Sequence, residues 1–238
     1  MKPALIIPAR MASERLPAKA LKDIAGKSLV QHVWTRAMDA DLGPVYVATD
    51  HISIAEEVNR FGGEVIMTDA SLPTGSDRVA QAFLSLEEKP DVVINLQGDL
   101  PLIDPKQIKR VLEPLEAGYD VGTLVTFMDQ SKQKNPSYVK AIVSAEFGES
   151  VKRCHWFCRA ALDYGHFHLG VYAYTRTALQ RFADTAQHPL ELQESLEQLR
   201  VLTLGMSLGA ATVDSLALEV NTSQDLANVR KHFEPQVQ

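Results

Sequence analysis

Three cationic side chains lie close together near the N-terminus, in the segment ARMASERLPAK at residues 9–19. Arg10 and Arg15 can each hold phosphate oxygens in a bidentate fork, and Lys19 adds a compact point charge. A chain with a formal net charge of −6 has no general attraction for polyanions, so a local cluster of this kind is where one would bind. We therefore predict that the three residues cradle a triphosphate; a solvated basic loop is the alternative.

The same segment lacks two common phosphate-binding patterns. It contains neither G-x-x-x-x-G-K-[ST] nor G-x-G-x-x-G. A P-loop ATPase and a dinucleotide-binding protein are therefore not supported.

One carboxylate, Asp99, follows the apolar run VVINLQ and stands beside Gly98. Glycine allows a bulky ligand to approach the backbone, and a carboxylate here can hold Mg²⁺ together with phosphate oxygens and water. We predict that Asp99 binds Mg²⁺, with a strand-end cap as the alternative.

An uncharged residue, Asn221, stands in the octet LEVNTSQD at residues 218–225, at the expected end of a strand. Its carbonyl oxygen can ligate Mg²⁺ but brings no negative charge. Glu219 lies two residues earlier, on the same face of that strand, and could supply a negative charge to a cation bound there. Asp225 is a weaker candidate for this charge because it falls in the first turn of the last expected helix.

The first half of the chain alternates apolar runs with helix-like segments, which is typical of right-handed βαβ units and a parallel sheet. Strands are expected at 4–9, 45–50, 64–69 and 91–99, and helices at 28–40, 52–61 and 76–86. We predict an α/β fold with a mostly parallel twisted sheet and helices on both faces. Ligands of such sheets bind beyond the carboxyl ends of the strands, where the segments described above fall.

The second half is less regular. Strands are expected at 121–128, 138–144, 168–175 and 210–220, and helices at 189–202 and from 223 to about 232. We predict that residues 1–238 form one domain, in which 1–125 serve mainly the nucleotide and 126–238 form a smaller subregion for a second substrate and for dimerisation.

Composition excludes several classes of protein. With 45% apolar and 23% charged residues, the chain can bury a large core, and its acidic balance does not favour nucleic acid or an anionic membrane as a partner. No apolar run reaches membrane-spanning length and no cleavable signal segment is evident, so we expect a cytoplasmic protein. Cys154 and Cys158 are expected to be buried thiols, although nearby His155 keeps a metal site open as an alternative.

Seven segments, in order along nearly the whole chain, resemble the sugar-acid cytidylyltransferases, and most closely the CMP-Kdo synthetases (3-deoxy-manno-octulosonate cytidylyltransferases). They are IIPARMASERLPAKALKDIAGKSLVQHV at 6–33, TGSDR at 74–78, NLQGDLP at 95–101, NPSYVK at 135–140, HLGVYAY at 168–174, PLELQESLEQLR at 189–200 and VNTSQDL at 220–226. The resemblance implies a Rossmann-like nucleotidyltransferase fold and transfer of CMP from CTP to the anomeric hydroxyl of Kdo, with release of pyrophosphate.

The resemblance also implies roles for particular residues. Arg10, Lys19 and Asp99 would act in catalysis, and Asp99 and Asn221 would hold Mg²⁺. The nucleotide would be bound by Arg10, Arg15, Lys19, Ser76, Arg78 and Gln97, and the sugar by Gln97, Arg159, His168, Tyr172, Glu197 and Gln198, with Arg159 at its carboxylate. Tyr172 could instead be a core residue, Glu197 a solvated one, and Asp77 a charge at a helix start. A homodimer and a place in lipopolysaccharide synthesis are further implications.

Three departures from the family pattern leave alternatives open. The family usually has V-D-T-P-x-D-L where this chain has VNTSQDL, so its first Asp is replaced by Asn221. The segment between Arg159 and His168 is shorter than usual, and Ala18 and Ala20 stand where Gly and Pro are common. The alternatives are a weakened or inactive relative that binds nucleotide or sugar, and a cytidylyltransferase for a sialic-acid-like sugar. If Asn221 lies at the metal, Asn221→Asp should raise turnover at low Mg²⁺.

Overall fold

A computed structural model describes the chain except for residues 14, 130–131, 145–149 and 235–238. The chain forms two compact units, each assembled from separate stretches of sequence. The N-terminal unit comprises Pro3–Glu88, Asn95–Ile108 and Ala217–Gln238, and the central unit comprises Met1–Lys2, Lys89–Ile94 and Lys109–Leu216. Among the described residues no helix is long and apolar enough to cross a membrane.

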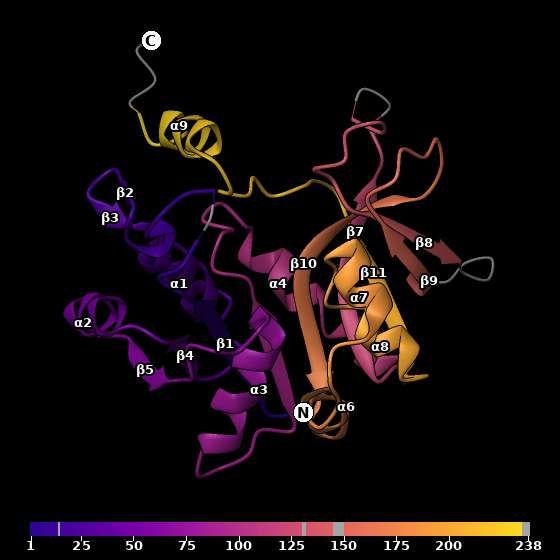
Figure 1. Cartoon of the computed structure of the whole chain (residues 1–238), viewed down its shortest axis with the longest axis horizontal. Coiled ribbons are helices and arrows are strands. Elements are labelled where there is room, and N and C mark those ends of the chain that lie inside the picture. Colours follow the sequence, from indigo (N-terminus) through magenta and orange to yellow (C-terminus); the bar gives the residue numbers. More distant parts are fainter. Residues whose placement is uncertain (14, 130–131, 145–149, 235–238) are drawn as a thin grey trace. The chain divides into compact units, whose positions relative to one another are not determined.

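The N-terminal unit has the predicted alternation of strands and helices (Figure 1). Its elements in order are β1 (Pro3–Ala9), α1 (Leu29–Asp39), β4 (Val45–Thr49), α2 (Ile52–Arg60), β5 (Glu64–Met67), α3 (Gly75–Ser85) and β6 (Val92–Leu96), of which the last two residues belong to this unit. Strands β1, β4 and β5 pair in parallel in the order β5-β4-β1, with Ala9 opposite Thr49. These strands therefore end at a common edge, as predicted.

The helices of this unit begin where capping side chains allow them to. The Ser28 hydroxyl accepts a hydrogen bond from the Gln31 amide at the start of α1, and Thr74 does the same for Asp77 at the start of α3. Asp77 is therefore the helix-start charge that we allowed for. The connections from β1 to β4 and from β4 to β5 both step toward the same edge of the sheet. Because such connections are right-handed, α1 and α2 lie on the same face of the sheet.

A small apolar core ties the loop after β1 to the C-terminal segment. It contains Leu16 from that loop and Val220, Leu226 and Val229 from around helix α9 (Ser223–Lys231), together with Ile24 and Leu29. The hydrophobic effect thus holds together two segments some two hundred positions apart in sequence. The helix expected from 223 to about 232 is confirmed.

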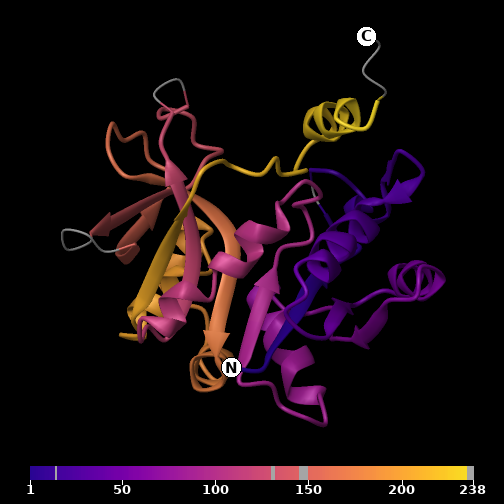
Figure 2. The same cartoon turned by 180° about the vertical axis from the view of Figure 1, so that it is seen from behind.

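The central unit contains a mixed sheet (Figure 2). Its strands β7 (Val121–Phe127), β8 (Lys140–Ser144), β9 (Val151–Cys158), β10 (His166–Thr175) and β11 (Leu208–Val213) lie in the order β10-β7-β11-β9-β8. β7 and β11 pair in parallel, whereas β10 with β7, β11 with β9 and β8 with β9 pair antiparallel. The α/β fold class is confirmed, and the parallel arrangement holds for the N-terminal unit but not for most pairs here.

Three expectations for the second half need correction. The helix expected at 189–202 is two short helices, α7 (Pro189–Glu194) and α8 (Leu199–Thr203), because Ser195 adopts a left-handed conformation with φ 54°. Residues 216–221 are not in a strand; Val220 N donates one hydrogen bond of 2.9 Å to Asp99 O. Strand β9 was missed because its polar residues interrupt the apolar run, although both of its cysteines are buried as predicted.

Candidate active site

The loop after β1 delivers Lys19 to the edge where the parallel strands end. Leu16 anchors the loop in the small core with only 5% of its surface exposed. Ala18 then takes a left-handed conformation, with φ 53°, and a short 3-10 helix η1 (Lys19–Leu21) begins at Lys19. Glycine adopts this left-handed conformation at a lower energetic cost than alanine does.

The Lys19 ammonium group joins the two predicted metal ligands. Its Nζ lies 3.0 Å from Asp99 Oδ2 and 3.3 Å from Asn221 Oδ1. The Lys19 and Asp99 side chains are about one-fifth exposed, so a ligand from solvent can reach them. Three segments distant in the sequence thus converge on one cation position, which confirms that the predicted residues are neighbours.

Asn221 has a second cation on its carbonyl side and a carboxylate on its amide side. Arg15 Nη2 donates to Asn221 Oδ1 at 3.1 Å, and Asn221 Nδ2 donates to Glu219 Oε2 at 3.0 Å. The strand face expected to align Glu219 with Asn221 does not exist, but the Glu219 carboxylate still contacts the Asn221 side chain, at its amide nitrogen.

Asp225 serves the helix and not the cation position. Its Oδ2 accepts hydrogen bonds from the amides of Asn221, at 3.1 Å, and of Thr222, at 2.8 Å. With the Thr222 hydroxyl it completes a capping box at the start of α9. The predicted first-turn position of Asp225 is correct.

Arg78 lies in a buried ion pair. Its Nη2 is 3.1 Å from Asp50 Oδ2, and the side chains are 3% and 9% exposed. Arg78 also donates to the Thr68 hydroxyl, and Asp50 Oδ1 accepts from the Met11 amide at 3.2 Å. Burial lowers the pKa of Arg78, against the opposing effect of Asp50. The pair fastens the start of the cationic loop, and direct contact of Arg78 with a nucleotide stays a prediction.

Ser76 and Gln97 lie around the buried Asn95. Asn95 Nδ2 donates to Ser76 Oγ at 3.0 Å, and Gln97 Nε2 lies 3.4 Å from Asn95 Oδ1. The neighbouring Gly98 has a structural reason of its own, because a Cβ there would come within 2.8 Å of Pro8 O. Close approach of two backbones explains this glycine without a ligand.

Arg10 is exposed, and its charge contributes to the lowered pKa of Arg78. Arg10, Arg15 and Lys19 all belong to the same unit as Asp99 and Asn221. Among the described residues no three His, Cys, Asp or Glu side chains are grouped as for a metal ion. A divalent ion that keeps water and phosphate ligands needs only one or two protein oxygens, and Asp99 Oδ2 and Asn221 Oδ1 fit that requirement.

The predicted sugar-side residues belong to the central unit, except Gln97, which belongs to the N-terminal unit. Arg159, at the end of β9, directs Nη1 at the carbonyl oxygens of Pro136 and Ser137, at 3.3 and 3.4 Å. The buried Lys140 donates to the carbonyl of Asn135, in the same turn, at 2.8 Å. Arg159 and Lys140 thus bind the carbonyl oxygens of residues 135–137, and burial lowers the pKa of Lys140.

His168 and Tyr172 lie side by side, with ring centroids 5.4 Å apart. A bulge between Leu169 and Tyr172 keeps both on one face. His168 Nε2 is 3.0 Å from the Thr123 hydroxyl, and burial lowers the pKa of His168 to about 3, with a smaller effect of Arg159. The imidazole is therefore neutral near pH 7, and Tyr172 is buried with 3% exposure.

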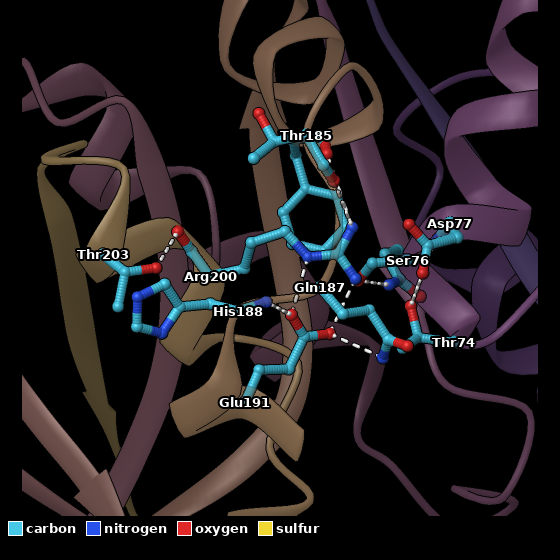
Figure 3. A network of polar contacts seen from close by, with 11 residues as sticks. Thr74, Ser76, Asp77, Thr185, Gln187, His188, Glu191, Arg200 and Thr203 are labelled. Carbon is cyan, nitrogen blue, oxygen red and sulfur yellow. Dashed lines mark hydrogen bonds and ion pairs between the residues drawn. The ribbon is translucent and has the colours of Figure 1, made fainter. Parts of the chain in front are cut away.

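Glu197 and Gln198 lie in the turn between α7 and α8, which differs from the expected helix. Sequence reasoning missed the pair that holds these helices together. Arg200 Nη2 and Nε contact the two carboxylate oxygens of Glu191 at 2.6 and 2.8 Å, and both side chains are at most 2% exposed (Figure 3). The charged types at 191 and 200 within PLELQESLEQLR were the available signal.

Comparison with known proteins agrees with this geometry. A family model described as "Cytidylyltransferase" matches residues 4–208. The chain is 43% identical to a 3-deoxy-manno-octulosonate cytidylyltransferase of Paramagnetospirillum magneticum, over 97% of each chain. It is 45% identical to one of Methylobacterium radiotolerans, over 96% of this chain and 95% of the relative.

Solved structures give the same result. A CMP:2-keto-3-deoxy-manno-octonic acid synthetase complexed with CTP matches with a TM-score of 0.89 and 33% identity, over 98% of each chain. The 4-diphosphocytidyl-2C-methyl-D-erythritol synthase of Anaerococcus prevotii matches with a TM-score of 0.66 but only 9% identity, which shows the fold alone. The fold and the family match are those of a nucleotidyltransferase. Within that class, the chain belongs to the cytidylyltransferase family, among the 3-deoxy-manno-octulosonate cytidylyltransferases.

Proposed function

We propose that this protein transfers CMP from CTP to the anomeric hydroxyl of Kdo and releases pyrophosphate. The observation that carries the proposal is the convergence of Lys19 on Asp99 Oδ2 and Asn221 Oδ1. The relatives named for this reaction support the choice of substrates. The new bond joins the sugar oxygen to the α-phosphorus, and the hydroxyl proton passes to water. The bond from that phosphorus to the bridging oxygen breaks, so negative charge grows on the leaving pyrophosphate.

The chain's own contribution is to position the reactants and neutralise charge. Arg10, Arg15 and Lys19 would bind the phosphate oxygens, where negative charge increases during the reaction. Asp99 and Asn221 would hold a Mg²⁺ ion. When bound, that ion supplies Lewis-acid polarisation of the phosphate and further charge neutralisation.

Arg159 is the residue we assign to the carboxylate of the sugar acid. Its present contacts are long hydrogen bonds of 3.3 and 3.4 Å to neutral carbonyl oxygens. A carboxylate would replace them with shorter, charge-assisted bonds. The neutral His168 and its neighbour Tyr172 would offer polar groups to sugar hydroxyls.

The direct test is pyrophosphate release with CTP, Mg²⁺ and a panel of sugar acids that includes Kdo and a sialic acid. We expect release with Kdo and CTP, and little with UTP or ATP. Release with the sialic acid alone would replace the sugar assignment. Binding of CTP without release in the presence of any acid would overturn the proposal and favour a relative that only binds, for which the uncharged Asn221 is the motivating observation.

The remaining expectations concern the setting of the enzyme. We propose a homodimer that works in the cytoplasm and activates Kdo for lipopolysaccharide synthesis. Light scattering coupled to gel filtration would test the dimer, and a mass of 26.3 kDa, that of one chain, would refute it.

A further inference from the structure

The side chain of Asn221 is held from both of its ends. Its Oδ1 accepts from Arg15 Nη2 and Lys19 Nζ, at 3.1 and 3.3 Å, and its Nδ2 donates to Glu219 Oε2 at 3.0 Å. Arg and Lys are donors only, and an ionised carboxylate is an acceptor only. Turning the amide by half a turn would direct its NH₂ group at two cations and its oxygen at an anion. The surrounding charges therefore determine which end of the amide faces Lys19.

We propose that Glu219 is a positioning residue that makes Asn221 a usable ligand for a divalent cation. The inference rests on the proposed function, because the cation is the one that would accompany the triphosphate. Glu219 keeps the carbonyl oxygen, and not the NH₂ group, directed at the position shared with Asp99. Its negative charge also polarises the amide, so the carbonyl oxygen becomes a stronger ligand. Outer partners of this kind commonly decide how well a ligand binds its metal.

The positioning role of Glu219 is needed only when residue 221 carries an amide. A carboxylate at position 221 would present an oxygen to the cation in either orientation, so it would not need Glu219. Its other oxygen would stand where Nδ2 now lies, facing Glu219 Oε2 at about hydrogen-bond distance. The two carboxylates would then repel each other. The effect of removing Glu219 should consequently depend on whether residue 221 is Asn or Asp.

A double-mutant cycle with Mn²⁺ as the probe tests this dependence. The affinity of Mn²⁺ for the protein with saturating CTP can be measured by electron paramagnetic resonance. We expect Glu219→Ala to weaken binding about three- to tenfold, since the lost hydrogen bond is exposed and worth roughly 1 kcal/mol. Glu219→Gln should retain much of the affinity because its side-chain oxygen can still accept from Asn221. In the Asn221→Asp background, Glu219→Ala should cause no loss.

A second readout needs no metal. The side-chain NH₂ resonances of Asn221, assigned by their disappearance in Asn221→Asp, should shift in Glu219→Ala and stay closer to the wild type in Glu219→Gln. Glu87→Ala removes an exposed glutamate of the same unit and is the matched control, expected to change neither the resonances nor the affinity.

Equal losses in the two backgrounds would overturn the proposal, because Glu219 would then act only as a distant charge. Unchanged Mn²⁺ affinity in Glu219→Ala would overturn it too, as would failure of the wild type to bind Mn²⁺. A cycle that behaves as expected in a protein that releases no pyrophosphate would instead refute the proposed function and leave the metal site standing. The cycle also refines the expectation for Asn221→Asp, whose gain at low Mg²⁺ should be larger when Glu219 is absent.

Discussion

Replacing Glu191 by Leu should destabilise the central unit far more than replacing a surface glutamate. Glu191 lies at the start of α7, where its carboxylate accepts two hydrogen bonds from Arg200, and its Oε2 also accepts from the His188 amide at 3.2 Å. Leucine has a similar volume but no acceptor. The substitution would leave a guanidinium group buried without a counterion and a helix start without half of its capping box.

The expected loss in the free energy of unfolding depends on how deeply the Glu191–Arg200 pair is buried and on which contacts Arg200 retains. The two side chains are 1% and 2% exposed, and breaking such a pair from one side costs about 3–5 kcal/mol. Arg200 retains hydrogen bonds to the carbonyl oxygens of Thr185 and Phe182, at 3.2 and 3.4 Å, and packs 4.0 Å from the Phe182 ring. These contacts favour the lower end, about 3 kcal/mol. Glu191→Leu combined with Arg200→Met should recover much of the loss because no charge is then left unpaired.

Urea unfolding followed by tryptophan fluorescence measures the effect. The two tryptophans lie in different units, so Trp34→Phe confines the fluorescence signal to Trp156 in the central unit. This substitution should be mild, because Trp34 Nε1 is buried and has no hydrogen-bond partner among the described residues. Glu113→Gln is the control, since its pair with Arg110 is about one-third exposed and should matter by less than about 1 kcal/mol. A loss below about 1 kcal/mol for Glu191→Leu would refute the reasoning, as would a double variant no more stable than the single one.

Three further predictions concern single positions. Lys19→Met should lower the rate of pyrophosphate release by about a hundredfold or more. It should change the free energy of unfolding by less than about 1 kcal/mol, because the Lys19–Asp99 pair is partly exposed. Lys27→Met, at an exposed lysine, is the control, and equal release rates in the two variants would refute the role of Lys19. Ala18→Gly should raise the free energy of unfolding by roughly 0.5–1 kcal/mol, since it relieves a left-handed alanine at φ 53° against the added flexibility of the unfolded chain, and a fall would contradict this. Burial lowers the pKa of His168 to about 3, so between pH 3 and its ordinary pKa of 6.5 the imidazole binds a proton only when the protein unfolds. The free energy of unfolding should therefore fall as the pH drops through this range, by up to about 1.4 kcal/mol per pH unit. His168→Asn should remove this part of the pH dependence, measured by urea unfolding at several pH values.

The sequence predicted the N-terminal unit well because its physical signals are local. Buried parallel strands appear as short apolar runs, and helices between them carry an apolar stripe and a capping residue such as Ser28 or Thr74. The residues predicted to bind phosphate and metal lie in the loops after those strands, so the positions of Lys19 and Asp99 could be anticipated from the topology.

The failures arose where distant contacts outweigh local pattern. The apolar spacing of Leu190, Leu196 and Leu199 reads as one helix, but the left-handed Ser195 breaks it, and the Glu191–Arg200 pair holds the two short helices together. Nothing in single-sequence periodicity predicts a buried ion pair across nine positions. The extended segment before Asn221 was similarly read as a strand because apolar alternation does not distinguish a ladder from one backbone hydrogen bond to Asp99.

The uncharged amide of Asn221 matters for the neighbouring cations as well as for the proposed metal ion. Lys19 Nζ contacts one charged oxygen, on Asp99, and one neutral oxygen, on Asn221, and Arg15 contacts the same neutral oxygen. A triphosphate must take the place of such contacts, and a neutral acceptor is given up at a lower energetic cost than a carboxylate. We therefore expect the amide to attract a divalent ion less strongly than a carboxylate would, while leaving Arg15 and Lys19 more available for phosphate. Glu219, by fixing the orientation of the amide, allows both consequences to hold in one site.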